Sequence, residues 1–216
     1  HTVKSFQAVQ IKMRVQQNKG NDAQQMILYV SQYIRYTFRD NSSLVPLQTE
    51  LNQVQNYYKL QKLNTRDSSE LTISADPAVS KFPVPMLCIQ TFVENSFKHG
   101  RISSQPLNVH ISVQLTETEE GNYLNISIQD NGTGFPDEFL QSFLQHTEDA
   151  VTGQHIGIHN LRQRLTLLYG DQAGLICMNN SSGALTEIIL PIQEEPNTSS
   201  ETKSSLLSNE NLFSLS

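Results

Sequence analysis

Cysteine is scarce in this chain, with only Cys88 and Cys177 among its 216 residues. Two cysteines so far apart in sequence provide neither a disulfide framework nor a zinc site of the Cys-x-x-Cys kind, so a reducing cytosol fits best. The sequence also lacks an apolar run of about 18 residues and an apolar signal-peptide region, so these residues are not expected to span a membrane or direct export. Because a dense Lys/Arg cluster is absent and the formal net charge is -6, a duplex nucleic-acid binder is not expected.

The length allows a small helical element followed by one compact domain. In the first 66 residues, apolar side chains at helical spacing predict a hairpin of two amphipathic helices. Such a hairpin cannot bury its apolar stripe alone. It either pairs with a second copy, which we expect, or folds back on the following domain. The two rows are Ala23, Met26, Ile27, Val30, Ile34 and Phe38, then Leu47, Leu51, Val54, Tyr58 and Leu60.

From about residue 67 the pattern changes to alternating apolar residues with helical segments between them, which predicts strands paired antiparallel and three helices. The fold class is therefore α+β, with the hairpin followed by a two-layer α/β sandwich. The polar tail at 194–216 is expected to be disordered. Strands are predicted at 71–75, 107–115, 124–128, 175–178 and 185–190, and helices between Pro85 and Gly100, over 137–146 and through 158–168.

One face of the helix before Gly100 carries Glu94, Asn95 and Lys98. Residues three and four apart adjoin on a helix, so an acid, an amide and an ammonium group share one strip. An amide oxygen can bind Mg²⁺, a carboxylate can order or deprotonate a nucleophile, and a lysine can pair with phosphate. The alternative is an ordinary solvated helix face.

The stretch 130–135 begins with Asp130 at the end of an alternating strand and continues through Gly132 and Gly134. Glycines separated by one residue let the backbone approach a ligand closely, and the carboxylate can accept a hydrogen bond from an exocyclic amine such as that of adenine. The alternative is a tight turn, because Asp-Asn-Gly is common turn chemistry.

A second glycine pair, Gly153 and Gly157, precedes the helix that carries Arg162 and Arg164. A helix N-terminus preceded by flexible backbone is a natural anion site, so a triphosphate is expected there. The polar loop at 147–155 is then expected to be a lid.

The order of these segments resembles that of the Bergerat-fold ATPases, and most closely the LytS-like sensor histidine kinases, from residue 1 to about 192. Residues 93–100 look like the family's N box and 130–135 its G1 box. Residues 156–165, with 168–170, look like its G2 region and following helix. Residues 44–47 are also similar to the family's helical hairpin.

The resemblance implies a site for ATP and Mg²⁺. It assigns catalytic roles to His1, Glu94 and Lys98, with Glu94 assisting phosphoryl transfer, and makes Asn95 the Mg²⁺ ligand. Asp130 would read adenine, and the glycines would shape the pocket and its lid. The implied cofactor-binding residues are Asn95, His99, Asp130, Gly132, Gly134, Phe135, Ile156, Gly157 and Ile158.

The implied function is the kinase core of a two-component sensor histidine kinase. Residues 1–66 would be the dimerising, histidine-bearing hairpin and 67–193 the ATP-binding catalytic domain. ATP would phosphorylate a histidine, and a response-regulator aspartate would then receive the phosphoryl group. The expected setting is a homodimer, as the cytoplasmic domain of a bacterial cell-membrane sensor whose membrane segments lie upstream.

Some residues depart from the family pattern. His1 lies at about the family's distance from Arg35, but residues 2–4 lack the aromatic pattern, so His1 is either the phosphoacceptor or a tag remnant or chance start. His155 stands where the family usually has glycine, and Ala184 where it often has threonine. These departures leave an alternative open, a degenerate nucleotide-binding scaffold that regulates a partner without phosphoryl transfer. A gyrase, mismatch-repair or chaperone type ATPase is less favoured, because it would lack the helical hairpin.

Overall fold

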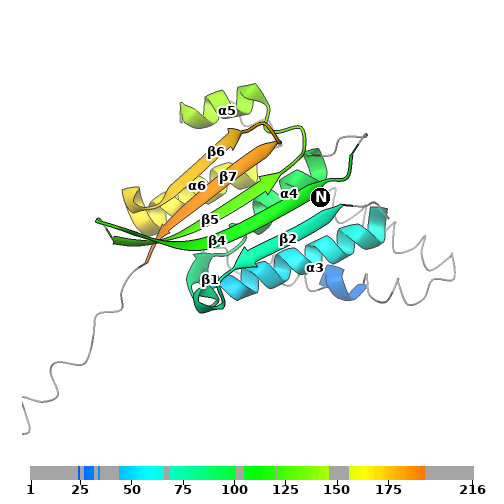
Figure 1. Cartoon of the computed structure of the whole chain (residues 1–216), viewed down its shortest axis with the longest axis horizontal. Coiled ribbons are helices and arrows are strands. Elements are labelled where there is room, and N and C mark those ends of the chain that lie inside the picture. Colours follow the sequence, from blue (N-terminus) through cyan, green and yellow to red (C-terminus); the bar gives the residue numbers. More distant parts are fainter. Residues whose placement is uncertain are drawn as a thin grey trace, which may run out of the picture.

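The computed structural model describes residues 24, 27–31, 34, 44–65, 69–100, 105–119, 121–145 and 156–192. Its main feature is a five-stranded sheet with the strand order β2-β4-β5-β7-β6 (Figure 1). The predicted α+β class is confirmed. The strands of this sheet are β2 (Glu70–Ala75), β4 (Asn108–Thr118), β5 (Gly121–Asp130), β6 (Gly174–Asn179) and β7 (Ala184–Pro191).

The long hairpin of β4 and β5 forms the centre of the sheet. Its alternation places Ile111 opposite Ile128 and Val113 opposite Ile126, and all four side chains are buried. The backbone of Gly121 at the turn has a φ of 137°, which residues with a Cβ rarely adopt. The predicted hairpin is therefore confirmed, and it ends at Asp130.

Strand β2 differs from its prediction. The sequence predicts antiparallel pairs throughout, but β2 runs parallel to β4, with Ile73 opposite Ile111. The prediction was wrong because the chain makes a crossover between these strands, through β3 (Pro83–Pro85) and α4 (Gln90–His99), and returns to start β4 in the same direction.

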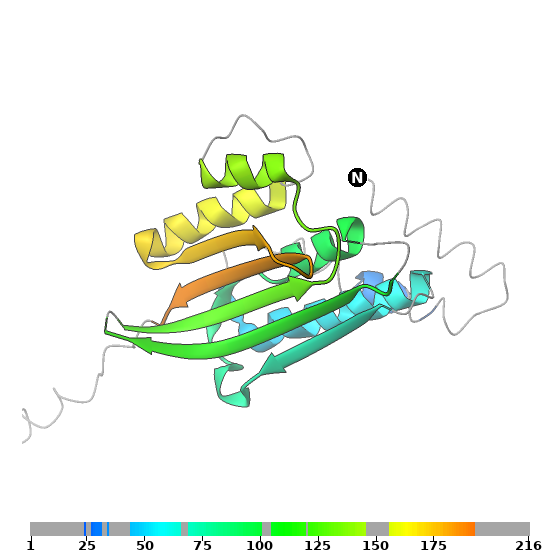
Figure 2. The same ribbon diagram turned by 45° about the horizontal axis from the view of Figure 1, so that its top comes forward.

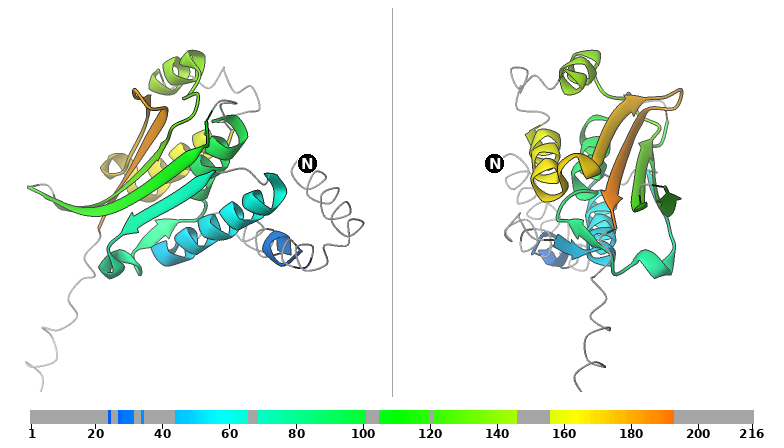
Figure 3. Two further views of the ribbon diagram at one scale, coloured as in Figure 1. Left: turned by 45° about the vertical axis from the view of Figure 1, so that its right-hand side comes forward. Right: turned by 90° about the vertical axis from the view of Figure 1, so that its left-hand side faces the viewer.

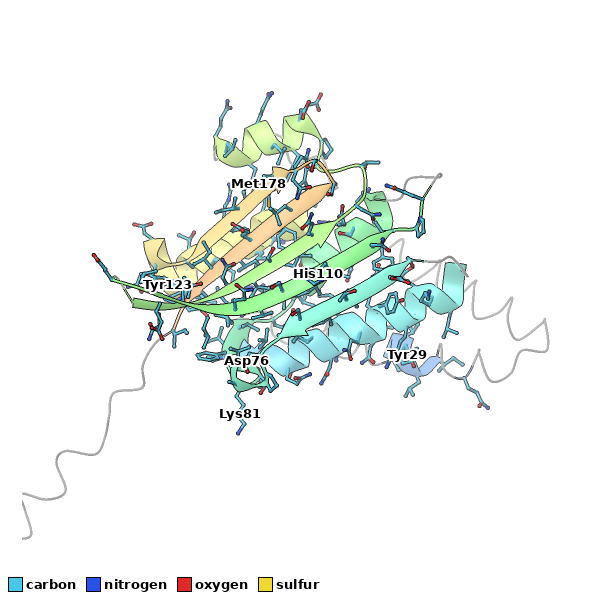
Figure 4. The ribbon with its side chains drawn as sticks, viewed as in Figure 1. Tyr29, Asp76, Lys81, His110, Tyr123 and Met178 are labelled. Carbon is cyan, nitrogen blue, oxygen red and sulfur yellow. The ribbon has the colours of Figure 1, made fainter. Side chains whose placement is uncertain are left out.

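Three helices cover one face of the sheet, namely α3 (Leu47–Thr65), α4 and α6 (Ile156–Tyr169) (Figure 3). The shorter α5 (Asp137–Leu144) lies beyond the end of β6 (Figure 2). Figure 4 shows the opposite face, where the labelled His110, Tyr123 and Met178 lie on strands with no described helix in front of them. The described part of the chain is therefore a helical layer packed on a sheet.

Helix α3 packs into the core of this sandwich. Leu47, Leu51, Val54 and Tyr57 are buried in the same cluster as residues of α4 and the sheet, and Leu60 is also buried. Strand β1 (Leu44–Pro46), which the sequence pattern did not reveal, pairs with β3 immediately before α3. The apolar row of this helix therefore folds back on the following domain, and packing continues across the predicted boundary at 66–67. Most of the first predicted helix, and the whole tail 194–216, lie outside the described residues.

The sequence predicts a helix that starts directly after Pro85, but α4 begins only at Gln90. Residues 86–89 form a turn in which Leu87 has a φ of 65°. Two elements hold this turn. The Glu50 carboxylate of α3 accepts hydrogen bonds from the backbone N–H of Leu87, Ile89 and Gln90, at 2.6, 3.1 and 3.4 Å. The guanidinium of Arg164 on α6 donates to the carbonyl of Met86 at 2.6 Å.

Candidate functional site

A pocket lies between one face of α4, the loop 131–136 after β5, and the inner faces of β5 and β7. Its apolar floor includes Phe92 and Ile128, and polar groups line its sides. Such a cavity, apolar with a few convergent polar groups, is typical of small-molecule sites. The residues predicted for the nucleotide site that line it are Asn95, His99, Asp130, Gly134 and Phe135.

Asp130 is the buried polar centre of the pocket, with only 6% of its surface exposed. One carboxylate oxygen, Oδ1, accepts from the backbone N–H of Gly132 at 2.9 Å and of Ala184 at 3.1 Å. The other, Oδ2, accepts from the hydroxyl of Ser96 at 2.5 Å. Because each carboxylate oxygen can accept about two hydrogen bonds, Oδ2 retains capacity for one further donor. The fold therefore positions an acceptor against the cavity.

The backbone around Asp130 is packed too tightly for side chains. A Cβ on Gly132 would lie 2.2 Å from the carbonyl oxygen of Gly100, at the end of α4. A Cβ on Gly183 would lie 2.7 Å from the nitrogen of Gly132 and 2.8 Å from Oδ1 of Asp130. Gly132 is therefore required by contact between the loop and α4, and Gly183, which the sequence argument did not single out, by contact with the carboxylate.

Asn179 fixes the far end of the same loop. Its side-chain oxygen accepts from the backbone N–H of Phe135 at 2.7 Å, and its amide nitrogen donates to the Phe135 carbonyl at 2.8 Å. Gly134 has a φ of 77°, and a Cβ there would lie 2.6 Å from the Asn179 oxygen. Gly134 is therefore needed for both its backbone conformation and the close approach of Asn179.

The predicted polar strip of α4 divides between two faces. Asn95 and His99 line the pocket together with Ser96, whereas Glu94 and Lys98 do not. These two form an ion pair at 2.9 Å beside the pocket. Ser96 was missed, although its spacing from Phe92 and from His99 or Gly100 is that of one helix face. Thr186 of β7, also missed, lines the pocket two residues after Ala184 on the same face of its strand.

Ile156, Gly157 and Ile158 do not line the pocket. Ile158 is fully buried in the core, and Ile156 is 47% exposed at the start of α6. Gly157 faces α4, where an added Cβ would lie 3.1 Å from a methyl group of Thr91. Of these three residues, Gly157 thus lies at the packing contact between α6 and α4.

The two arginines of α6 bind protein carbonyls. Arg162 donates to the Phe143 carbonyl at 2.6 Å, and its guanidinium carbon lies 4.4 Å from the centre of the Phe143 ring. Arg164 binds Met86 as described above. The guanidinium groups of these arginines attach α6 to α5 and to the turn before α4. The triphosphate site expected at the N-terminus of α6 stays a prediction, because residues 147–155 lie outside the described residues.

Other predicted residues lie outside the described part of the chain, namely His1 and the lid 147–155 with Gly153 and His155. Within the described residues, no three His, Cys, Asp or Glu side chains gather in a way that could hold a metal ion. No helix there is both long enough and apolar enough to cross a bilayer.

Two family models of known proteins match this chain, one in its N-terminal part and one in its C-terminal part. Residues 84–196 match a family model described as histidine kinase-, DNA gyrase B-, and HSP90-like ATPase, and residues 7–69 match one described as histidine kinase. An uncharacterized sensor-like histidine kinase of Staphylococcus epidermidis is 32% identical over 79% of this chain and 33% of its own length. Sensor protein LytS of Oceanobacillus iheyensis is 29% identical over 87% of this chain and 32% of its own length.

The chain thus spans about a third of the length of these curated relatives. Among solved structures, the catalytic domain of histidine kinase ThkA aligns with a TM-score of 0.53, at 12% identity, over 71% of this chain and 98% of that domain. At this identity the likeness concerns the fold alone.

Proposed function

Because the chain belongs to the histidine kinase-, DNA gyrase B- and HSP90-like ATPase family, we propose that it is the kinase core of a two-component sensor histidine kinase. It uses ATP to phosphorylate a histidine and passes the phosphoryl group to an aspartate of a response regulator. The matches to sensor kinases over most of the chain support this choice within the family.

The observation that carries the proposal is the buried Asp130 carboxylate at the pocket wall. The exocyclic amine of adenine is a donor that suits the remaining capacity of Oδ2, and the apolar Phe92 and Ile128 suit the base itself. The ligand is therefore ATP or ADP, read at its base by Asp130.

The residues present fit a magnesium ion that arrives with the nucleotide. Mg²⁺ is commonly bound by one or two protein oxygens together with phosphates and water, and the side-chain oxygen of Asn95 is a suitable ligand on the pocket wall. The lack of a three-residue metal cluster in the described residues argues for this shared coordination over a resident ion. When bound, Mg²⁺ neutralises charge on the phosphates.

In the transfer step, an imidazole nitrogen of the acceptor histidine forms a bond to the γ-phosphorus while the bond from that phosphorus to the bridging oxygen of ADP breaks. Glu94, the residue before the pocket-lining Asn95, is proposed to orient the imidazole and accept its proton. Lys98, which is paired with Glu94, and His99, which lines the pocket, are proposed to act on the phosphates. The acceptor is His1, which lies outside the described residues.

The hairpin of residues 1–66 supplies dimerisation and the acceptor, and residues 67–193 supply ATP binding. Attachment to a membrane is assigned to segments outside this sequence.

Nucleotide binding tests the site. Asn95→Ala and Asp130→Asn are each expected to weaken Mg-dependent ATP binding about tenfold in titration calorimetry, since each removes one ligand or one charged hydrogen bond. Asn122→Ala, at an exposed position at the start of β5, is the control and should bind as the parent does. Parent-like affinity in both site variants would show that the nucleotide binds elsewhere.

A degenerate scaffold is the second candidate, because Ala184 lines the pocket without the hydroxyl that the family often has there. Incubation with labelled ATP separates the two. Acid-labile, base-stable phosphate on His1 supports the kinase. Nucleotide binding with no transfer, in a chain extended upstream of His1, supports the scaffold.

A further inference from the structure

Gln90, the first residue of α4, has a side chain that packing does not explain. Only 1% of the residue is exposed. Its amide nitrogen donates to Oε1 of Glu94 at 3.1 Å, but its buried side-chain oxygen has no hydrogen-bond partner among the described residues. A buried acceptor without a donor destabilises a fold, and leucine or methionine would fill the same space without that cost. An amide at this position therefore needs a reason other than stability.

The bonding of Glu94 supplies a reason. Gln90 binds one of its carboxylate oxygens from one turn earlier in the helix, and Lys98 binds the other, at 2.9 Å, from one turn later. Because each oxygen of the Glu94 carboxylate has its own hydrogen-bond partner, these two contacts fix the orientation of the carboxylate group. The side chain of Glu94 is 14% exposed and that of Lys98 is 39% exposed. The Gln90 contact is thus the less hydrated of the two.

The backbone of Gln90 is also fixed. Glu50 of α3 is fully buried, and its carboxylate accepts from the N–H groups that start α4, including that of Gln90 at 3.4 Å. The amide therefore projects from a position set by a neighbouring helix. A neutral donor suits this place, because a charged donor at such burial would pay a large desolvation cost.

We infer that Gln90 is a positioning residue for Glu94, which orients the carboxylate toward the acceptor histidine without neutralising its charge. This inference rests on the proposed function. A positioning role for Gln90 has a different consequence from that of a purely structural contact between residues i and i+4, whose loss would lower stability. Removing the amide is expected to lower the rate of transfer while stability stays equal or rises.

The test compares Gln90→Leu with the parent. We expect Gln90→Leu to keep or raise the melting temperature, to bind ATP as tightly as the parent, and to lower the maximal rate of histidine phosphorylation about tenfold with KM for ATP unchanged. Gln90→Glu, which keeps the shape but places a second carboxylate beside Glu94, should lower the rate at least as much. Parent-like transfer in Gln90→Leu would overturn the inference, as would a loss of stability that accounts for the lost rate.

A second measurement does not need transfer to occur. The side-chain amide protons of Gln90, observed by NMR in the full chain, are expected to exchange slowly, and Glu94→Leu should change their chemical shift and speed their exchange. If the parent shows no phosphorylation, the proposed function fails, whereas the amide signals still report on the contact. Signals unchanged by Glu94→Leu would overturn the positioning role whether or not transfer is seen.

Discussion

Replacing Asn179 by alanine should loosen the loop that forms one wall of the pocket. The substitution removes the two hydrogen bonds, of 2.7 and 2.8 Å, that join the Asn179 amide to the backbone of Phe135. Phe135 is itself only 9% exposed, so its N–H and carbonyl are poorly placed to bind water instead. With a net value of about 1 kcal/mol for each bond, the free energy of unfolding should fall by about 2 kcal/mol.

The loop remains attached at its other end, where Gly132 donates to Asp130 at 2.9 Å. We therefore expect Asn179→Ala to fold and to bind ATP several-fold more weakly, because ordering the loop then costs part of the binding energy. Urea denaturation measures the first effect and titration calorimetry the second, with the exposed Asn122→Ala as the matched control. If Asn179→Ala equals Asn122→Ala in both assays, the loop does not depend on this amide and the reasoning is refuted.

Two further predictions concern stability. Gly132→Ala places a Cβ 2.2 Å from the carbonyl oxygen of Gly100 and should lower the free energy of unfolding, measured in urea, by about 2 kcal/mol. In the control Gly174→Ala, the Cβ would meet only the Ile189 side chain, at 3.3 Å or more, so the free energy of unfolding should hardly change. Burial raises the pKa of Cys177 from 9.0 to about 12, against smaller opposing effects of Thr186 and Arg162. Between about pH 9 and about pH 12 the folded chain therefore keeps a proton that the unfolded chain releases, so the free energy of unfolding falls as pH rises. Cys177→Ala should make that fall shallower, as measured by denaturation at about pH 8 and pH 10. Equal destabilisation by both glycine variants, or an unchanged pH slope in Cys177→Ala, would contradict the respective argument.

The sequence is most informative where structure depends on neighbours along the chain. The alternation that ends at Asp130 predicts the β4–β5 hairpin, because each strand's inward residues repeat every second position and the turn is short. The polar residues of α4 and the glycine-containing loop are likewise local patterns. The order of these two segments along the chain is what predicts a nucleotide-binding site.

Long-range contacts are what the sequence could not provide. A glutamate on an amphipathic helix is expected to lie at the surface, yet Glu50 is fully buried. Its carboxylate accepts hydrogen bonds from backbone N–H groups that are 37 to 40 residues away in sequence. Pro83 and Pro85 indicate a break in the chain, but they are the first and last residues of a short strand that pairs with β1. The sequence likewise does not reveal that Arg164 donates to the carbonyl of Met86, 78 residues away.

Helix α4 links these observations, because its two ends and its middle are fixed by different elements. Glu50 binds its start, Ser96 binds Asp130 near its middle, and Gly100 contacts Gly132 at its end. Base recognition and the proposed positioning of Glu94 therefore depend on different side chains of one helix, Ser96 and Gln90 respectively. Because those two side chains bind different carboxylates, their effects are separable. Loss of the Ser96 hydroxyl should act on nucleotide affinity and loss of the Gln90 amide on transfer, whereas a change that moves the whole helix should alter both together.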